Sequence, residues 1–189
     1  MKTINIDEKE MLFLDEKEME KIKLNLELIH SNSKKILVSS TLEGEGKTSV
    51  ALGLSIFMAK CGGKVLYAAS ECPEILTVDS QDEDRYTTSL ENLDIIIGND
   101  FRKIEENSEN YDYVIVDSKA LSVSNESVTY ANMCDLILLV IETNRADYRK
   151  VLESKNILTL GKCKEVRVVL NRTRRTYGMF RRKVRNLEK

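Results

Sequence analysis

Residues 41–48 read TLEGEGKT. They stand between a continuous apolar run and a segment whose apolar residues recur at helical spacing. Residues 35–39 (KILVS) form a short apolar run, which is typical of a strand buried within a sheet. Residues 47–60 carry their apolar side chains at helical spacing, and a Gly-Gly pair ends that pattern. A strand, a glycine-containing turn and a helix in this order match GxxxxGK[ST], the pattern of a phosphate-binding loop, with Thr41 at the first glycine position.

The residue types of this loop suit the phosphates of a nucleotide. Gly44 and Gly46 can adopt positive φ angles, so successive backbone N–H groups can curl around phosphate oxygens at the start of a helix. Lys47 would reach the β and γ phosphates, and the Thr48 hydroxyl would bind Mg²⁺. We therefore predict a P-loop that binds ATP or ADP with Mg²⁺. The alternative is a glycine-rich turn that carries Lys-Thr by coincidence.

A second sign of a nucleotide site is an acid at the end of another apolar run. Residues 113–116 (YVIV) lead into Asp117, where a Walker B carboxylate would hold the metal through water. Alone, such an aspartate is more often a helix cap or a turn residue. Together with the loop, it predicts a metal site made by Thr48 and Asp117.

Apolar runs alternate with amphipathic segments along most of the chain. Further strands are expected at residues 64–69, 93–97, 136–141 and 165–170, and further helices at residues 15–29, 101–108, 126–133 and 146–160. Residues 1–14 show no clear pattern, and the polar residues 70–92 are expected to form a loop with at most a short helix. This alternation predicts an α/β fold, a mostly parallel sheet covered by helices on both faces. We expect one nucleotide-binding domain over residues 1–171.

Composition narrows the class of protein. No apolar run approaches the roughly 18 residues that a membrane span needs, and the N-terminus lacks the pattern of a signal peptide. The four cysteines are scattered without a CxxC pair, which favours reduced thiols in the cytoplasm. His30 is the only histidine, so histidine-based metal sites and Ser–His or Cys–His triads are not expected.

The last residues, 172–189, form a basic tail with eight basic residues and one acid. Such a segment suits contact with an anionic membrane, because each basic residue near the surface contributes about 1 kcal/mol. The open alternatives are a solvated tail, a helix docked on the tail's own domain and, less expected, nucleic acid. Tyr177 is a candidate phosphorylation site in this tail.

Four stretches carry a resemblance to a known family: KKILVSSTLEGEGKTSVALGLS, YDYVIVDS, ANMCDLILLVIETN and VRVVLNR. In order and spacing they resemble the bacterial protein-tyrosine kinases of capsule and exopolysaccharide synthesis, in the MinD/ParA-like branch of P-loop proteins. The resemblance covers most of residues 20–172. It implies ATP-dependent tyrosine phosphorylation in the cytoplasm, at the inner face of the membrane, with a membrane-embedded polysaccharide-assembly partner. It implies nucleotide contacts at Glu43, Gly44, Glu45, Gly46, Lys47, Thr48, Ser49, Asn171 and Arg172, with Asn171 near the adenine.

The chain departs from this family at positions where the family carries residues for phosphoryl transfer. Aligning KVLYAASECP on the family's DxDxR signature puts Ala69 at the first acid and Glu71 at the second. We expect Glu71 to replace the missing acid in part, beside Lys47 and Asp117 as the other catalytic residues. The family's ExxRxxR ring-assembly motif is also lost, which favours a monomer or dimer. We therefore predict Mg-nucleotide binding with weakened phosphoryl transfer.

Two other functions remain open. One is a non-catalytic adaptor whose bound nucleotide controls assembly with a partner. The other is a MinD/ParA-like ATPase that reaches a membrane or DNA through the basic tail, although such proteins usually carry a lysine early in the loop. Here that stretch is LEGEG, without a lysine, and both of its glutamates, Glu43 and Glu45, are expected to be solvated.

Overall fold

The computed structural model describes residues 2–6, 15–29, 32–74, 76, 85–98, 100–143, 145, 147–160 and 165–172. The strands are β1 (Lys2–Ile4), β2 (Lys35–Ser40), β3 (Val65–Ala69), β4 (Arg85–Thr88), β5 (Leu93–Ile97), β6 (Tyr113–Asp117), β7 (Leu136–Glu142) and β8 (Val166–Asn171). The helices are α1 (Glu16–Ile29), α2 (Lys47–Lys60), α3 (Phe101–Ser108), α4 (Glu126–Ala131) and α5 (Tyr148–Leu158).

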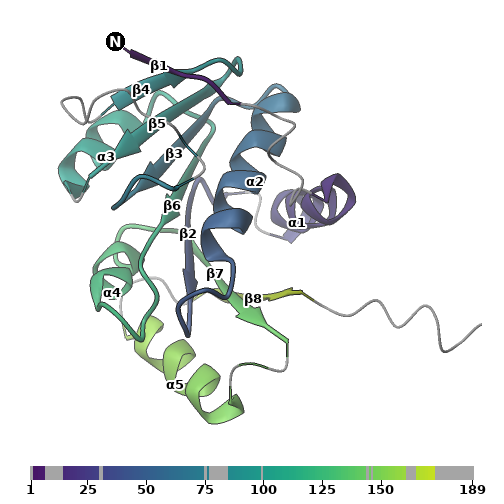
Figure 1. Ribbon diagram of the computed structural model, residues 1–189, viewed down its shortest axis with the longest axis vertical. Coiled ribbons are helices and arrows are strands. Elements are labelled where there is room, and N and C mark those ends of the chain that lie inside the picture. Colours follow the sequence, from purple (N-terminus) through teal and green to yellow (C-terminus); the bar gives the residue numbers. More distant parts are fainter. Residues whose placement is uncertain are drawn as a thin grey trace, which may run out of the picture.

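The strands form one sheet in the order β1-β4-β5-β3-β6-β2-β7-β8 (Figure 1). Neighbouring strands run parallel except for β4 and β5, which are antiparallel. The predicted α/β fold with a mostly parallel sheet is therefore confirmed. Because parallel strands end at the same edge of a sheet, the segments that follow β2, β3 and β6 meet at one place.

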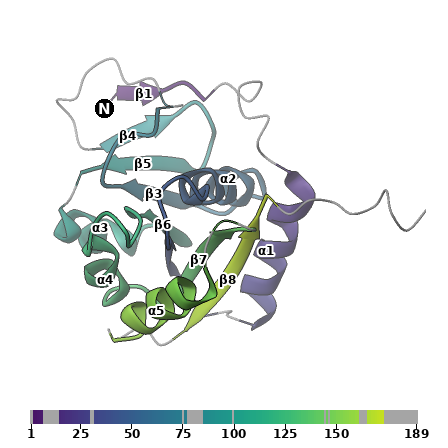
Figure 2. The same cartoon turned by 60° about the horizontal axis from the view of Figure 1, so that its bottom comes forward.

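Helices cover both faces of this sheet (Figure 2). Val38 of β2 and Ile115 of β6 pack in one apolar layer with α1 and α2, while Leu37 and Val116 pack in the other layer with α3, α4 and α5. Successive side chains of a strand point to opposite faces, so the central strands are buried on both sides. This burial explains why they read as continuous apolar runs in the sequence.

One strand lies where the sequence predicted a loop. β4 falls within residues 70–92, and the expectation of a loop there is wrong for this part of it. Its sequence RYTT contains a single apolar side chain, Tyr86, which is 2% exposed. Arg85 is held by its neighbours, donating to Asp94 at 3.1 Å and to the Tyr111 hydroxyl at 2.7 Å. A short strand fixed by polar partners leaves no apolar pattern to detect.

The N-terminus also contains a strand that the sequence pattern did not indicate. β1 pairs in parallel with β4 at one edge of the sheet, and Ile4 and Ile6 are buried. The expected helix at residues 15–29 is confirmed as α1, which packs on α2. Residues 173–189, including Tyr177, lie outside the described residues, so the basic tail stays a prediction. No helix within the described ranges is both long and apolar enough to cross a membrane.

Candidate nucleotide site

The predicted loop joins β2 to α2 and has the expected backbone geometry. Gly44 and Gly46 adopt φ angles of +78° and +90°, in the left-handed region that favours glycine. A Cβ atom at Gly46 would lie 2.1 Å from Asn171 Nδ2, so position 46 also lacks room for any side chain. Gly46 is the N-cap of α2 and offers no side-chain cap, so the first N–H groups of this helix can face an anion.

Glu45 has an unexpected place in this loop. Its side chain is 0% exposed, and the expectation that it is solvated is wrong. Its Oε2 accepts from Leu42 N at 2.6 Å, and its Oε1 accepts from Glu142 N at 3.3 Å. The carboxylate turns inward because these two backbone donors would otherwise lack acceptors. Glu43, by contrast, is exposed as expected.

Asn171 closes the loop from the last strand. Its Nδ2 donates to the Glu45 carbonyl at 2.9 Å, and its Oδ1 accepts from Arg172 N at 2.8 Å. The residue that the resemblance placed near the adenine therefore holds the phosphate loop itself in this structure. Together, Glu45 and Asn171 tie the loop to the ends of β7 and β8.

Asp117 ends β6 beside the loop, and only 6% of it is exposed. Its Oδ2 accepts a hydrogen bond from the Tyr67 hydroxyl at 2.8 Å, while its buried Oδ1 has no partner among the described residues. Burial raises the pKa of Asp117, while the charge of Lys47 and the nearby hydroxyls of Tyr67 and Thr48 act in the opposite direction. Burial likewise raises the pKa of Tyr67, which keeps its hydroxyl protonated as a donor.

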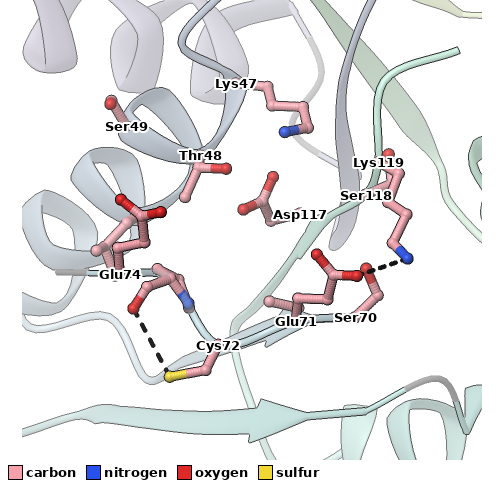
Figure 3. A pocket seen from close by; sticks show the side chains of 13 residues that line it. Lys47, Thr48, Ser49, Ser70, Glu71, Cys72, Glu74, Asp117, Ser118 and Lys119 are labelled. Carbon is pink, nitrogen blue, oxygen red and sulfur yellow. Dashed lines mark hydrogen bonds and ion pairs between the residues drawn. The ribbon is translucent and has the colours of Figure 1, made fainter. Parts of the chain in front are cut away.

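A cavity of about 410 Å³ opens between the loop, the end of β3 and the end of β6 (Figure 3). Its lining comprises Lys47, Thr48, Ser49, Leu52, Ala69, Ser70, Glu71, Cys72, Pro73, Glu74, Asp117, Ser118 and Lys119. The predicted residues Lys47, Thr48 and Asp117 thus converge on one space, with Ser49 at its side.

The donor set in this cavity fits Mg²⁺ carried by a nucleotide. Thr48 offers a hydroxyl and Asp117 offers its unpartnered Oδ1, which are the hard oxygen ligands that this ion prefers. The described residues contain no cluster of three His, Cys, Asp or Glu side chains that would hold a metal ion alone. The remaining ligands would therefore have to come from phosphate oxygens and water.

The position of the missing acid lies directly beside Asp117. Ala69 is in register with Asp117 on the neighbouring parallel strand and lines the same cavity. Glu71, the expected replacement, lies at the rim with 73% of its side chain exposed. Its Oε1 is 2.6 Å from Lys119 Nζ, and this partner raises the pKa of Lys119. Glu71 lines the cavity as predicted, but its carboxylate is engaged by a lysine.

Two arginines flank the other side of the loop. Arg145 and Arg172 each donate to Oε2 of Glu142 at 3.0 Å, and they lower the pKa of that carboxyl group. The Arg145 guanidinium lies so close to Gly44 that a Cβ atom there would be 3.0 Å from its Nη1. Arg172, a predicted nucleotide contact, has a positive φ of 52°.

Sequence reasoning missed four residues of this site: Tyr67, Lys119, Glu142 and Arg145. Tyr67 reads as an ordinary core residue of an apolar strand, and its role depends on the register between β3 and β6. Lys119 and Arg145 follow strand ends at the edge where the loop lies, and that position was the one available signal.

No protein-family model and no curated protein sequence matches the chain. Solved structures do match. The VpsO kinase domain has a TM-score of 0.72 at 20% identity, over 88% of this chain and 97% of that one. The kinase domain of the Escherichia coli tyrosine kinase ETK has a TM-score of 0.69 at 16% identity, over 88% and 83%. A chain from the MinC:MinD cell division complex of Aquifex aeolicus has a TM-score of 0.62 at 20% identity, over 79% and 72%.

Identities of 16–20% show the fold and leave the activity open. The resemblance drawn from the four sequence stretches is confirmed at this level. The chain has the P-loop fold shared by bacterial tyrosine kinase domains and the MinD/ParA ATPases.

Proposed function

We propose that this chain binds Mg-ATP in the manner of the bacterial tyrosine kinases that regulate polysaccharide synthesis and export, with weakened phosphoryl transfer. The observation that carries the proposal is the unpartnered, buried Oδ1 of Asp117 beside Lys47 and Thr48 in one cavity. A buried carboxylate oxygen without a partner costs free energy, which a metal ion or its water would offset. ATP or ADP with Mg²⁺ is the ligand that supplies such a partner.

Each residue has a distinct part in this proposal. The N–H groups of residues 43–49 and the start of α2 bind the phosphates, and Lys47 neutralises the charge on the outer ones. Thr48 and Asp117 hold the metal, which would supply charge stabilisation at the transferred phosphoryl group. Asn171 and Arg172 lie next to the loop, where we propose that they contact the nucleoside.

The proposal of weakened phosphoryl transfer rests on the residues that would contact the attacking hydroxyl group. A kinase needs a group that orients or deprotonates the attacking hydroxyl, and Ala69 supplies none. Glu71 is the nearest acid in the sequence alignment, but it is paired with Lys119 at 2.6 Å. We propose that Glu71 acts only when this pair opens.

The test is the affinity for a fluorescent ATP analogue, measured with Mg²⁺ and with EDTA. Wild-type protein should bind more tightly with Mg²⁺, and Lys47→Ala should lose at least tenfold in affinity, as expected for the loss of a charged hydrogen bond of about 1.5–3 kcal/mol. Lys150→Ala is the matched control, because Lys150 is exposed on α5. Unchanged nucleotide affinity in Lys47→Ala would refute the proposal.

A second candidate function is a nucleotide-gated adaptor without chemistry. The Glu71–Lys119 pair favours it, because an engaged acid at the cavity rim leaves the bound nucleotide without a base. A membrane-embedded polysaccharide-assembly protein is the proposed partner in either case, at the inner face of the membrane. ADP release that depends on a partner peptide, with no phosphate transfer to tyrosine, would support the adaptor.

A further inference from the structure

The Tyr67 hydroxyl donates a hydrogen bond to Asp117, one of the two proposed metal ligands. Tyr67 is 0% exposed in the middle of β3, and its hydroxyl lies 2.8 Å from Asp117 Oδ2. Tyr67 is in register with Ile115, two residues before Asp117 on the neighbouring strand. Since side chains two residues apart share a face, all three lie on the side of the sheet covered by α2.

This hydrogen bond distinguishes the two oxygens of Asp117. Oδ2 accepts from Tyr67, whereas Oδ1 is buried without a partner among the described residues. The tyrosine ring is fixed within the apolar layer under α2, so the donor has one position. A fixed donor at Oδ2 restricts the rotation of the carboxylate and so limits where Oδ1 can lie.

From this geometry we infer that Tyr67 is a positioning residue, which orients Asp117 so that Oδ1 faces the metal of a bound Mg-nucleotide. The inference rests on the proposed function and extends it to a residue outside the phosphate loop and outside the family's acidic signature. Its importance follows from Ala69, which stands in register with Asp117 and carries no second carboxylate. Because Asp117 is the one carboxylate among the proposed metal ligands Thr48 and Asp117, its orientation would decide how strongly Mg²⁺ binds.

The test compares nucleotide affinity with Mg²⁺ and with EDTA in Tyr67→Phe, which removes the hydroxyl and keeps the ring. The affinity in EDTA should match wild type, while the gain from Mg²⁺ should fall roughly tenfold, as expected for a lost hydrogen bond to a charged group. Tyr111→Phe is the matched control. It also removes a tyrosine–aspartate hydrogen bond, to Asp94, but Tyr111 does not line the cavity.

A double-mutant cycle separates positioning from general stability. In an Asp117→Asn background, Tyr67→Phe should have no further effect on the Mg²⁺ gain, because the oriented carboxylate is already absent. Equal Mg²⁺ gains in Tyr67→Phe and wild type would overturn the inference. So would an equal loss in Tyr67→Phe and Tyr111→Phe, which would indicate destabilisation alone.

A second variant keeps the inference testable even where Tyr67→Phe does not fold. Asp117→Glu retains the charge but moves the carboxylate away from the position fixed by Tyr67, so its Mg²⁺ gain should also fall about tenfold. A wild-type gain in Asp117→Glu would show that orientation is unimportant. Wild-type protein that binds no nucleotide at all would instead refute the proposed function, and the two failures are therefore distinct.

Discussion

Gly46 shows at the scale of one residue how closely the phosphate loop is fitted to its surroundings. Its φ of +90° excludes most side chains, and the amide of Asn171 occupies the space that a Cβ would take. Gly62 has the same φ of +90°, but nothing lies within 4 Å of its Cβ position. Substituting Gly62 therefore tests backbone strain alone, whereas substituting Gly46 tests strain together with a steric clash.

Gly62→Ala should cost about 1–2 kcal/mol of unfolding free energy, the usual penalty of a left-handed conformation. Gly46→Ala should cost more and should also weaken nucleotide binding, because the loop must move away from Asn171. Urea unfolding and nucleotide titration measure the two effects. Equal costs for both variants, with binding intact, would contradict this account of the loop.

Ala69 offers a gain-of-function test at the same scale. Ala69→Asp would place a carboxylate in register with Asp117 and at the cavity wall. Two like charges side by side destabilise the metal-free protein, and Mg²⁺ would relieve that repulsion. We expect a lower melting temperature in EDTA and, with Mg-ATP, a phosphoryl-transfer rate at least about tenfold higher, since a positioned base contributes 10²–10⁴-fold.

Ala69→Asn is the control for this experiment, because it has the same size without the charge. It should reproduce neither the Mg²⁺-dependent stability nor the faster transfer. A rate for Ala69→Asp equal to wild type would indicate that the missing acid is not what limits turnover.

At the scale of elements, β4 pairs with β1 and β5, and a polar cluster beside β5 and α3 holds its first residue, Arg85. Tyr111 donates to Asp94 at 2.5 Å and accepts from Arg85 at 2.7 Å. Burial and the hydrogen bond to Asp94 raise the pKa of Tyr111 to about 12, from 10.0. The folded protein thus holds this proton more tightly than the unfolded chain does.

The sign of the pH effect follows from that raised pKa. The stability contributed by protonated Tyr111 is fully present below pH 10 and is lost as the pH rises toward about 12. Tyr111→Phe should lack this part of the alkaline loss. Unfolding free energies of both proteins between pH 8 and 12 measure the difference, and parallel curves would contradict it.

The elements also show what sequence can and cannot predict. β2, β3, β5, β6, β7 and β8 were predicted because each carries an apolar run. β1 and β4 were missed because they are short, and each contributes only one apolar side chain, Ile4 or Tyr86, which is too few to form an apolar run. Within the site, the loop chemistry was predictable from residue types. The inward turn of Glu45 and the Tyr67–Asp117 bond were not, because they depend on neighbours far along the chain.

At the scale of the whole molecule, stability should decrease from the centre of the sheet to its edges. β2, β3 and β6 lie in the middle and are almost fully buried, whereas Val168 and Leu170 of the edge strand β8 are 49% and 59% exposed. Amide hydrogen exchange should therefore be slowest in the central strands and faster in β1, β4 and β8.

Binding of Mg-ATP should slow amide exchange in β8, which lies far from the phosphate loop in the sequence. Protection should rise in β8 as well as in the loop, because Asn171 joins them through the Glu45 carbonyl. Exchange with and without Mg-ATP measures the effect. Asn171→Ala should lose the added protection of β8, and protection confined to the loop in wild type would exclude such coupling.

The bond between Asn171 and the loop has a consequence for the kinetics of the bound nucleotide. The loop is closed by the end of β8, whose one strand neighbour within the described residues is β7, and an edge strand opens more readily than a central one. Each opening of β8 would break the hydrogen bond between Asn171 and the Glu45 carbonyl and so loosen one side of the phosphate loop. The residence time of the nucleotide would then depend on the edge of the sheet, and any protein that paired with β8 would lengthen it without touching the nucleotide.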